Sequence, residues 1–148
     1  MSLDKLKIIQ DEWTKDSVID QQNVDDEVTK IPKLHQKYLD LLTHVKIQVF
    51  KKQAEFLQLK GARSRYYNGS MGREDLEKYG WVQYQGKLPL KSELERLLEV
   101  DDILLVAEEK LFELKASFEY LEEVMKSLRY RSMDLKTIFE WKKFIAGG

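Results

Sequence analysis

Cysteine is absent from the 148-residue chain, and helix breakers are scarce, with two prolines and seven glycines. The missing thiols exclude a disulfide framework, a cysteine nucleophile and thiolate metal ligands, and they fit a reducing compartment. The scarcity of proline and glycine favours long helices over an all-β fold. No apolar run reaches the length of a membrane span, and the first residues lack the hydrophobic stretch of a signal peptide. We therefore expect a helical protein of the cytoplasm that does not enter a membrane.

Groupings of catalytic or metal-binding residues are also missing. The segment Gly61–Gly69 lacks the Gly-Lys-Ser/Thr ending of a phosphate-binding P-loop. His35 and His44 have no acidic cluster to complete a metal site. The aspartate pairs at 25–26 and 101–102 are adjacent, and adjacent helical residues do not face each other, which argues against paired-carboxylate catalysis. We expect neither an enzyme nor a bound cofactor or metal.

The charges are sorted into blocks, although the formal net charge is only -1. Residues 1–28 contain eight acidic residues against three lysines, and residues 43–67 contain six basic residues against Glu55 alone. Residues 89–125 are again acidic and residues 126–148 again basic. Such segregation of charge gives information about binding partners rather than about the fold. The basic blocks favour a polyanion, and the acidic blocks favour a basic protein surface or another subunit.

Hydrophobic periodicity predicts the helices of the first half. A short amphipathic helix is expected over residues 3–13, followed by a linker at 16–20 and a long helix over 24–67, with Pro32 in its first turn or at a kink. The long helix carries one apolar stripe of 3.6-residue period, formed by Leu34, Tyr38, Leu41, Leu42, Val45 and Val49.

The second half is expected to be helical after a break. Residues 68–88 are rich in glycine and aromatic residues, and residues 81–85 fit either a short strand or a mobile loop. A second long helix should run from Pro89 to about residue 128, and a final helix over 133–146. A heptad seam in the second long helix fits a contact within one chain or between subunits; it comprises Ala107, Leu111, Leu114, Phe118, Leu121, Met125 and Leu128.

Together these patterns predict an all-α fold in a single helical domain, residues 1–148. It consists of N-terminal helices (1–67), a loop (68–88) and a helical region (89–148) that ends in an oligomerisation helix. Exposed apolar stripes usually meet a partner, so we expect the chain to form a homo-oligomer. The candidate oligomerisation residues are Leu121, Met125, Leu128, Ile138, Trp141, Phe144 and Ile145.

The end of the first long helix is the strongest candidate for a binding site. At about 100° per residue, the apolar stripe continues into Lys52, Phe56, Lys60, Arg63 and Tyr67, so the face becomes basic and aromatic after residue 50. Lysine and arginine neutralise phosphates, and tyrosines offer flat faces on which unpaired bases stack. The alternative is a solvated helix end whose arginines complement the helix dipole. The candidate nucleic-acid-binding residues are Lys52, Lys60, Arg63, Arg65, Tyr66 and Tyr67.

Two runs in the sequence resemble a known family. Ala62-Arg63, two variable residues, Tyr66-Tyr67, a small polar residue and Gly69 resemble a segment of the UvsY family, the recombination mediators of T-even phages. The ending Phe144–Gly147 resembles that family's Phe-x-Ala-Gly terminus. The order of acidic, basic, glycine-rich and acidic segments agrees over nearly the whole chain.

This resemblance implies a non-enzymatic, ring-shaped homo-oligomer, hexameric or heptameric, in the host cell cytoplasm. Such proteins bind single-stranded DNA and help a RecA-like recombinase displace the single-strand-binding protein, so both proteins are implied partners. The family's DNA-binding motif has a lysine two residues before the arginine that corresponds to Arg63. Here that position is Gly61, and the nearest lysine is Lys60. Arg65 is an extra base.

Two other functions fit the same residues. A coiled-coil structural or adaptor protein would use its basic block only to pair with an acidic helix of another subunit. An enzyme with an unrecognised site, such as a nuclease, is the second alternative.

Overall fold

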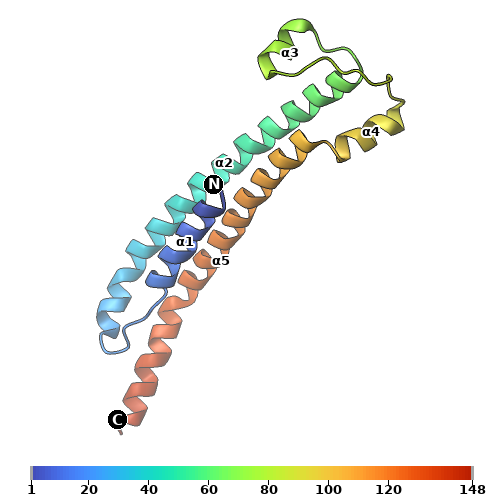
Figure 1. The fold of residues 1–148 in the computed structure, drawn as a ribbon. Coiled ribbons are helices and arrows are strands. Elements are labelled where there is room, and N and C mark those ends of the chain that lie inside the picture. Colours follow the sequence, from blue (N-terminus) through green and yellow to red (C-terminus); the bar gives the residue numbers. More distant parts are fainter. Residues whose placement is uncertain (1, 148) are drawn as a thin grey trace. The chain divides into compact units, whose positions relative to one another are not determined.

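The computed structural model describes residues 2–147. Five helices and no strand are found within this range, so the predicted all-α fold is confirmed. In chain order they are α1 (Ser2–Asp16), α2 (Val24–Tyr67), α3 (Arg73–Tyr79), α4 (Lys91–Glu99) and α5 (Asp102–Ile145) (Figure 1). None of these helices is both long and apolar enough to cross a membrane.

The helices form two compact units. The first combines the residues up to Val49 with those from Glu113 onward, and the second is Phe50–Phe112. The long helices α2 and α5 therefore each contribute to both units.

The core of the first unit is built from three helices. Figure 1 shows α1 beside α2 and α5. The buried residue that α1 contributes to the core is Ile9. The predicted stripe of α2 faces this core, with Tyr38 fully buried and contacted by the edge of the Trp13 ring at a centroid distance of 5.3 Å. Each large apolar side chain buried here stabilises the fold by roughly 1.5–3 kcal/mol relative to its exposed state. The residues that α5 contributes are Leu121, Val124, Met125 and Leu128.

The predicted heptad seam therefore packs within the chain. Leu121, Met125 and Leu128 are 0%, 8% and 2% exposed and contact the core residues of α1 and α2. These three side chains, which the sequence assigned to oligomerisation, are not accessible to a second subunit. The spacing of these apolar residues in steps of four and three reflects the packing of α5 against α1 and α2 of the same chain.

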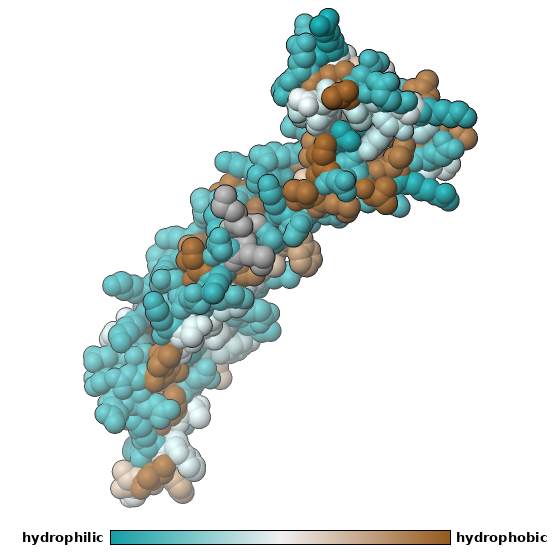
Figure 2. All heavy atoms as spheres, viewed as in Figure 1, coloured by the Kyte–Doolittle hydropathy of each residue, from teal (hydrophilic) through white to brown (hydrophobic). Residues whose placement is uncertain are grey.

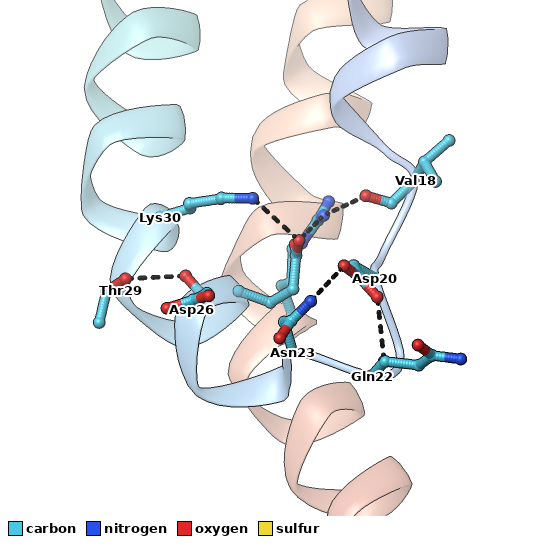
Figure 3. A network of polar contacts seen from close by, with 9 residues as sticks. Val18, Asp20, Gln22, Asn23, Asp26, Thr29 and Lys30 are labelled. Atoms are coloured by element: carbon cyan, nitrogen blue, oxygen red, sulfur yellow. Dashed lines mark hydrogen bonds and ion pairs between the residues drawn. The ribbon is translucent and has the colours of Figure 1, made fainter.

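The connection between α1 and α2 is organised by Asp20 (Figure 3). One carboxylate oxygen of Asp20 accepts the backbone N–H of Gln22 at 3.0 Å, and the other accepts the side-chain amide of Asn23 at 2.7 Å. The carbonyl of Asn23 then accepts the N–H of Glu27 as the first turn of α2 forms. Three acidic residues in that turn, Asp25, Asp26 and Glu27, suit the positive end of the helix dipole.

A buried ion pair holds this connection against α5. Arg131 of α5 lies 3.4 Å from Glu27 and donates to the carbonyl of Val18 at 3.2 Å. Both charged side chains are only 5% exposed, and Lys30 adds a second contact to Glu27 at 3.2 Å (Figure 3). The Nε of Arg131 has no hydrogen-bond partner among the described residues. The pair therefore fixes the geometry of the unit while leaving one donor unsatisfied.

The helix α2 has the predicted bounds. It ends at Tyr67 because Gly69 adopts a left-handed conformation, with φ of 76°, which favours glycine. The N–H of Ser70 then bonds to the carbonyl of Arg65 at 3.1 Å, which is the closing bond of a Schellman motif. Pro32 lies inside α2, well beyond its first turn.

The second half differs from the prediction at three places. The single helix expected over 89–128 is interrupted after Glu99, because Asp101 caps a new helix by accepting the N–H of Leu104 at 2.9 Å. The break expected near residue 130 does not occur, since no glycine or proline interrupts α5 there. Within 68–88 the structure contains the short helix α3, and residues 81–85 form no strand.

Candidate nucleic-acid interface

The last turns of α2 contain a buried polar cluster centred on Arg63. Its Nε donates to Oδ2 of Asp101 at 2.8 Å, and its Nη2 lies 2.8 Å from the same oxygen. The hydroxyl of Tyr67 donates to that oxygen at 2.6 Å and accepts from Arg63 Nη2 at 3.2 Å. The Arg63 side chain is 9% exposed and that of Asp101 is 1% exposed. The cluster thus joins the end of α2 to the start of α5.

Asp101 has two tasks in this cluster. Its Oδ1 caps α5 through the N–H of Leu104, and its Oδ2 receives Arg63 and Tyr67. Both oxygens are therefore satisfied, as a buried carboxylate requires. The same residue ends the preceding helical run and holds the only arginine buried in this unit's described residues.

The protonation states of the cluster follow from this arrangement. Burial alone would raise the pKa of Asp101, but the hydrogen bonds from Tyr67 and Arg63 hold it below its ordinary value. Burial would lower the pKa of Arg63, but the bonds to Asp101 and Tyr67 raise it overall. Burial and the Asp101 carboxylate together raise the pKa of Tyr67. At neutral pH the cluster therefore contains a carboxylate, a guanidinium and a protonated phenol.

Aromatic rings surround the guanidinium of Arg63. Its Cζ lies 4.4 Å from the ring centre of Tyr66, 4.6 Å from that of Trp81 and 5.1 Å from that of Tyr67. The hydroxyl of Tyr66 donates to the carbonyl of Val82 at 2.5 Å. These contacts tie the segment that follows α3 to the end of α2. Such cation–π contacts are worth about 0.5–2 kcal/mol each, more where water is excluded.

The six predicted nucleic-acid-binding residues divide into two groups. Arg63 is buried and Tyr66 and Tyr67 are half-buried, and the structure brings these three together. Lys52, Lys60 and Arg65 are exposed. The prediction that Arg63 lies on a charged surface is wrong for this structure. The stripe that Arg63 continues faces the interior, where its side chain forms an ion pair with Asp101.

The three exposed cations have different surroundings. Lys52 pairs with Glu55 at 3.1 Å. Lys60 borders a surface hollow of about 480 Å³ whose other polar lining is three carboxylates, those of Glu95, Glu99 and Glu108. Arg65 has no ion-pair partner among the described residues. Arg65 is therefore the cation of the strip that is most available to a phosphate.

Sequence reasoning missed three residues of this site. Asp101 was considered only as half of an adjacent carboxylate pair, and its role as the partner of Arg63 has no local signal. Trp81 and Tyr84 belong to the aromatic run that the sequence does reveal, but their contacts with Tyr66 require the folded loop. The ring centroids of Trp81 and Tyr84 both lie 5.7 Å from that of Tyr66.

The remaining predicted oligomerisation residues lie near the C-terminal end of α5. Trp141, Phe144 and Ile145 are 61%, 71% and 66% exposed, and Ile138 is half-buried. The rings of Trp141 and Phe144 stack with a centroid distance of 5.8 Å. Figure 2 shows hydrophobic side chains at the surface of this end of α5. The exposed apolar surface in the first unit is thus available for a partner.

A metal centre finds no support in the described residues, since none of their His, Asp and Glu side chains gather in groups of three that could hold an ion. The fold and the site therefore define an all-α protein with two helices of 44 residues and a buried arginine–carboxylate cluster at the end of one of them. Residues 12–148 match the family model described as "Recombination, repair and ssDNA binding protein UvsY". The chain belongs to the UvsY family.

Solved structures with the same fold include crystal structures of the bacteriophage T4 recombination mediator protein UvsY. One lattice form aligns with a TM-score of 0.80 and 20% identity, covering 94% of this chain and 98% of that chain. Another aligns with a TM-score of 0.79 and 22% identity, covering 95% and 96%. A comparison with curated protein sequences gave no match.

Proposed function

We propose that this protein is a recombination mediator. In this proposal it binds single-stranded DNA as a ring-shaped homo-oligomer and promotes loading of a RecA-like recombinase onto strands covered by single-strand-binding protein. The match of residues 12–148 to a family described by recombination, repair and single-stranded DNA binding carries the proposal. The arrangement at the end of α2 supports it.

The DNA strand would be held at the end of α2. Exposed Arg65, with Lys60 and Lys52 nearer the middle of the helix, would contact phosphates. Lys52 precedes Lys60 by eight residues, or roughly 12 Å along the helix axis. Arg63 is buried and would act indirectly, because its guanidinium contacts Trp81 of the loop and pairs with Asp101.

Assembly would make a weak site strong. A single chain offers few uncompensated cations, but copies arranged in a ring raise the effective concentration of sites along one strand. The exposed Trp141, Phe144 and Ile145 are the residues through which we propose that the copies meet. The acidic blocks remain candidates for contacts with the recombinase and the single-strand-binding protein.

The test is binding of the purified chain to single-stranded DNA over a salt series, together with its light-scattering mass with and without DNA. A mediator should bind, and its affinity should fall steeply as salt rises, because phosphate contacts release counterions. A coiled-coil adaptor would show little binding at any salt concentration. Incubation of the same DNA with divalent metal tests the nuclease alternative, which requires cleavage products.

A further inference from the structure

Two aromatic rings beside the Arg63 cluster are stacked in parallel. Tyr79 is the last residue of α3, and Trp81 follows one residue later. Their ring centroids are 4.3 Å apart and their planes differ by 13°. This is the closest pair among the ring contacts within the described residues, and the others in this unit are tilted or edge-on. The geometry resembles that of neighbouring bases in a nucleic acid.

Backbone bonds fix the position of this pair. Gly80 between the two rings is in the left-handed conformation and ends α3, with its N–H bonded to the carbonyls of Glu77 and Leu76. The N–H of Trp81 bonds to the carbonyl of Leu76 at 2.9 Å. The ring pair is therefore anchored to α3 on one side and, through the contact of Trp81 with Arg63, to α2 on the other.

Tyr79 is the more exposed member of the pair. Trp81 is half-buried, whereas Tyr79 is 37% exposed. One face of the Tyr79 ring lies against Trp81, and the Nζ of Lys78 lies over the ring at 5.8 Å from its centre.

One cation lies directly over the Tyr79 ring. The Nζ of Lys78 lies 5.8 Å from the centre of the Tyr79 ring. Lys78 and Arg65 are both exposed, and Arg65 lies on the last turn of α2, next to the Tyr66 ring that contacts Trp81. A partly exposed ring accompanied by a lysine matches a base and a flanking phosphate, whereas a protein partner with an apolar face would not require the cation.

We propose that Tyr79 and Trp81 form a base-stacking platform for single-stranded DNA, with Lys78 contacting a phosphate and Arg63 positioning the rings. A base of the strand stacks on the face of Tyr79 that is turned away from Trp81 and extends the existing stack by one ring. This inference rests on the proposed function, and it adds binding residues outside the helix α2. It also gives the buried Arg63 a part in DNA binding through the rings that surround it.

The experiment compares two short strands of equal length, an oligothymidylate and an abasic strand with the same phosphates. Both are titrated with the native chain and with the variants Tyr79→Leu and Tyr79→Phe. Leucine keeps apolar bulk without a ring, and phenylalanine keeps the ring without the hydroxyl. Phe112→Leu is the control, since Phe112 is 71% exposed in the same unit and contacts none of the platform residues through its ring.

Tyr79→Leu should weaken oligothymidylate binding by about fivefold to 150-fold, the range expected for loss of one stacked base. Its affinity for the abasic strand should stay within about twofold of native, and Tyr79→Phe and Phe112→Leu should bind both strands as the native chain does. Unchanged oligothymidylate affinity in Tyr79→Leu would overturn the platform, as would equal losses for both strands. If the native chain itself binds neither strand, the proposed function fails instead.

Discussion

Arg63 and Asp101, 38 residues apart in sequence, form an ion pair of 2.8 Å that is almost completely buried. The arginine belongs to the basic and aromatic run at the end of α2, yet its side chain points inward. The pair connects the end of α2 to the cap of α5, so disturbing it should affect stability and DNA binding together. Substitutions at the two positions separate these effects.

Asp101→Asn tests the ion pair apart from the helix cap. Asparagine caps helices about as well as aspartate, but it leaves the buried Arg63 charge uncompensated. We expect a loss of about 3 kcal/mol in the free energy of unfolding, from the 3–5 kcal/mol typical of breaking a buried pair. Asp101→Ala should lose about 1 kcal/mol more, because the cap is lost as well. Denaturant unfolding measures both, and equal losses would mean that the cap contributes nothing.

The same carboxylate should make stability depend on pH. Because the folded pKa of Asp101 lies below its ordinary value of 3.8, its contribution is fully present above that value. The contribution is lost as the pH falls from 3.8 through the folded pKa. Unfolding curves of the native chain and Asp101→Asn should therefore differ most near neutral pH and converge in acid. A constant difference from neutral pH to pH 2 would contradict the assignment.

Arg63→Lys distinguishes a positioning role from a direct phosphate contact. Lysine keeps the charge but loses the planar fork that binds Asp101 and the flat surface that lies against Trp81. If Arg63 positions the rings, Arg63→Lys should weaken oligothymidylate binding nearly as much as Arg63→Ala. Both variants should also change the tryptophan emission of the free protein, with Trp81→Phe as the reference spectrum. Near-native DNA affinity in Arg63→Lys would favour a phosphate contact.

The Arg131–Glu27 pair should be replaceable as a unit. Arg131→Met alone leaves Glu27 buried beside Lys30 only and should cost about 3 kcal/mol in the free energy of unfolding. The double variant Arg131→Met with Glu27→Leu should recover most of this loss, because the pair leaves the Arg131 Nε unsatisfied. A double-mutant cycle by denaturant unfolding measures the coupling. Additive losses would show that the two charges do not interact.

Trp141→Ser with Phe144→Ser tests the C-terminal surface. Both side chains are exposed, so their removal should leave the helicity of the chain unchanged. If copies of the chain meet through this surface, the light-scattering mass should fall to that of smaller species. Tyr130→Ser, at a tyrosine that is 55% exposed on the same helix, serves as the comparison. An unchanged mass in the double variant would place the interface elsewhere.

Helices that are specified by local sequence patterns could be predicted from the sequence. The bounds of α2 agree with the sequence pattern because apolar residues recur at helical spacing and Asn68-Gly69 provides a stop. No pattern predicts α3, since seven residues give too little periodicity. The break at Val100 has no glycine or proline, and its local signal is a single capping residue, Asp101, inside a long apolar pattern.

The candidate site shows the same division. The helical projection correctly places Arg63 and Tyr67 on one face of α2, because that face is a property of spacing alone. Whether that face meets solvent or another helix depends on residues far along the chain. Nothing near Arg63 in the sequence identifies Asp101 as its partner, so the sequence pattern alone predicts an exposed arginine.

The separation of 38 residues between Arg63 and Asp101 also sets an order of events during folding. The pair can form only after the intervening segment has brought its two ends together. During synthesis, all of α2 is translated before Asp101. A nascent chain that stops short of Asp101 therefore lacks the buried partner of Arg63, and the complete cluster forms only when both residues are present.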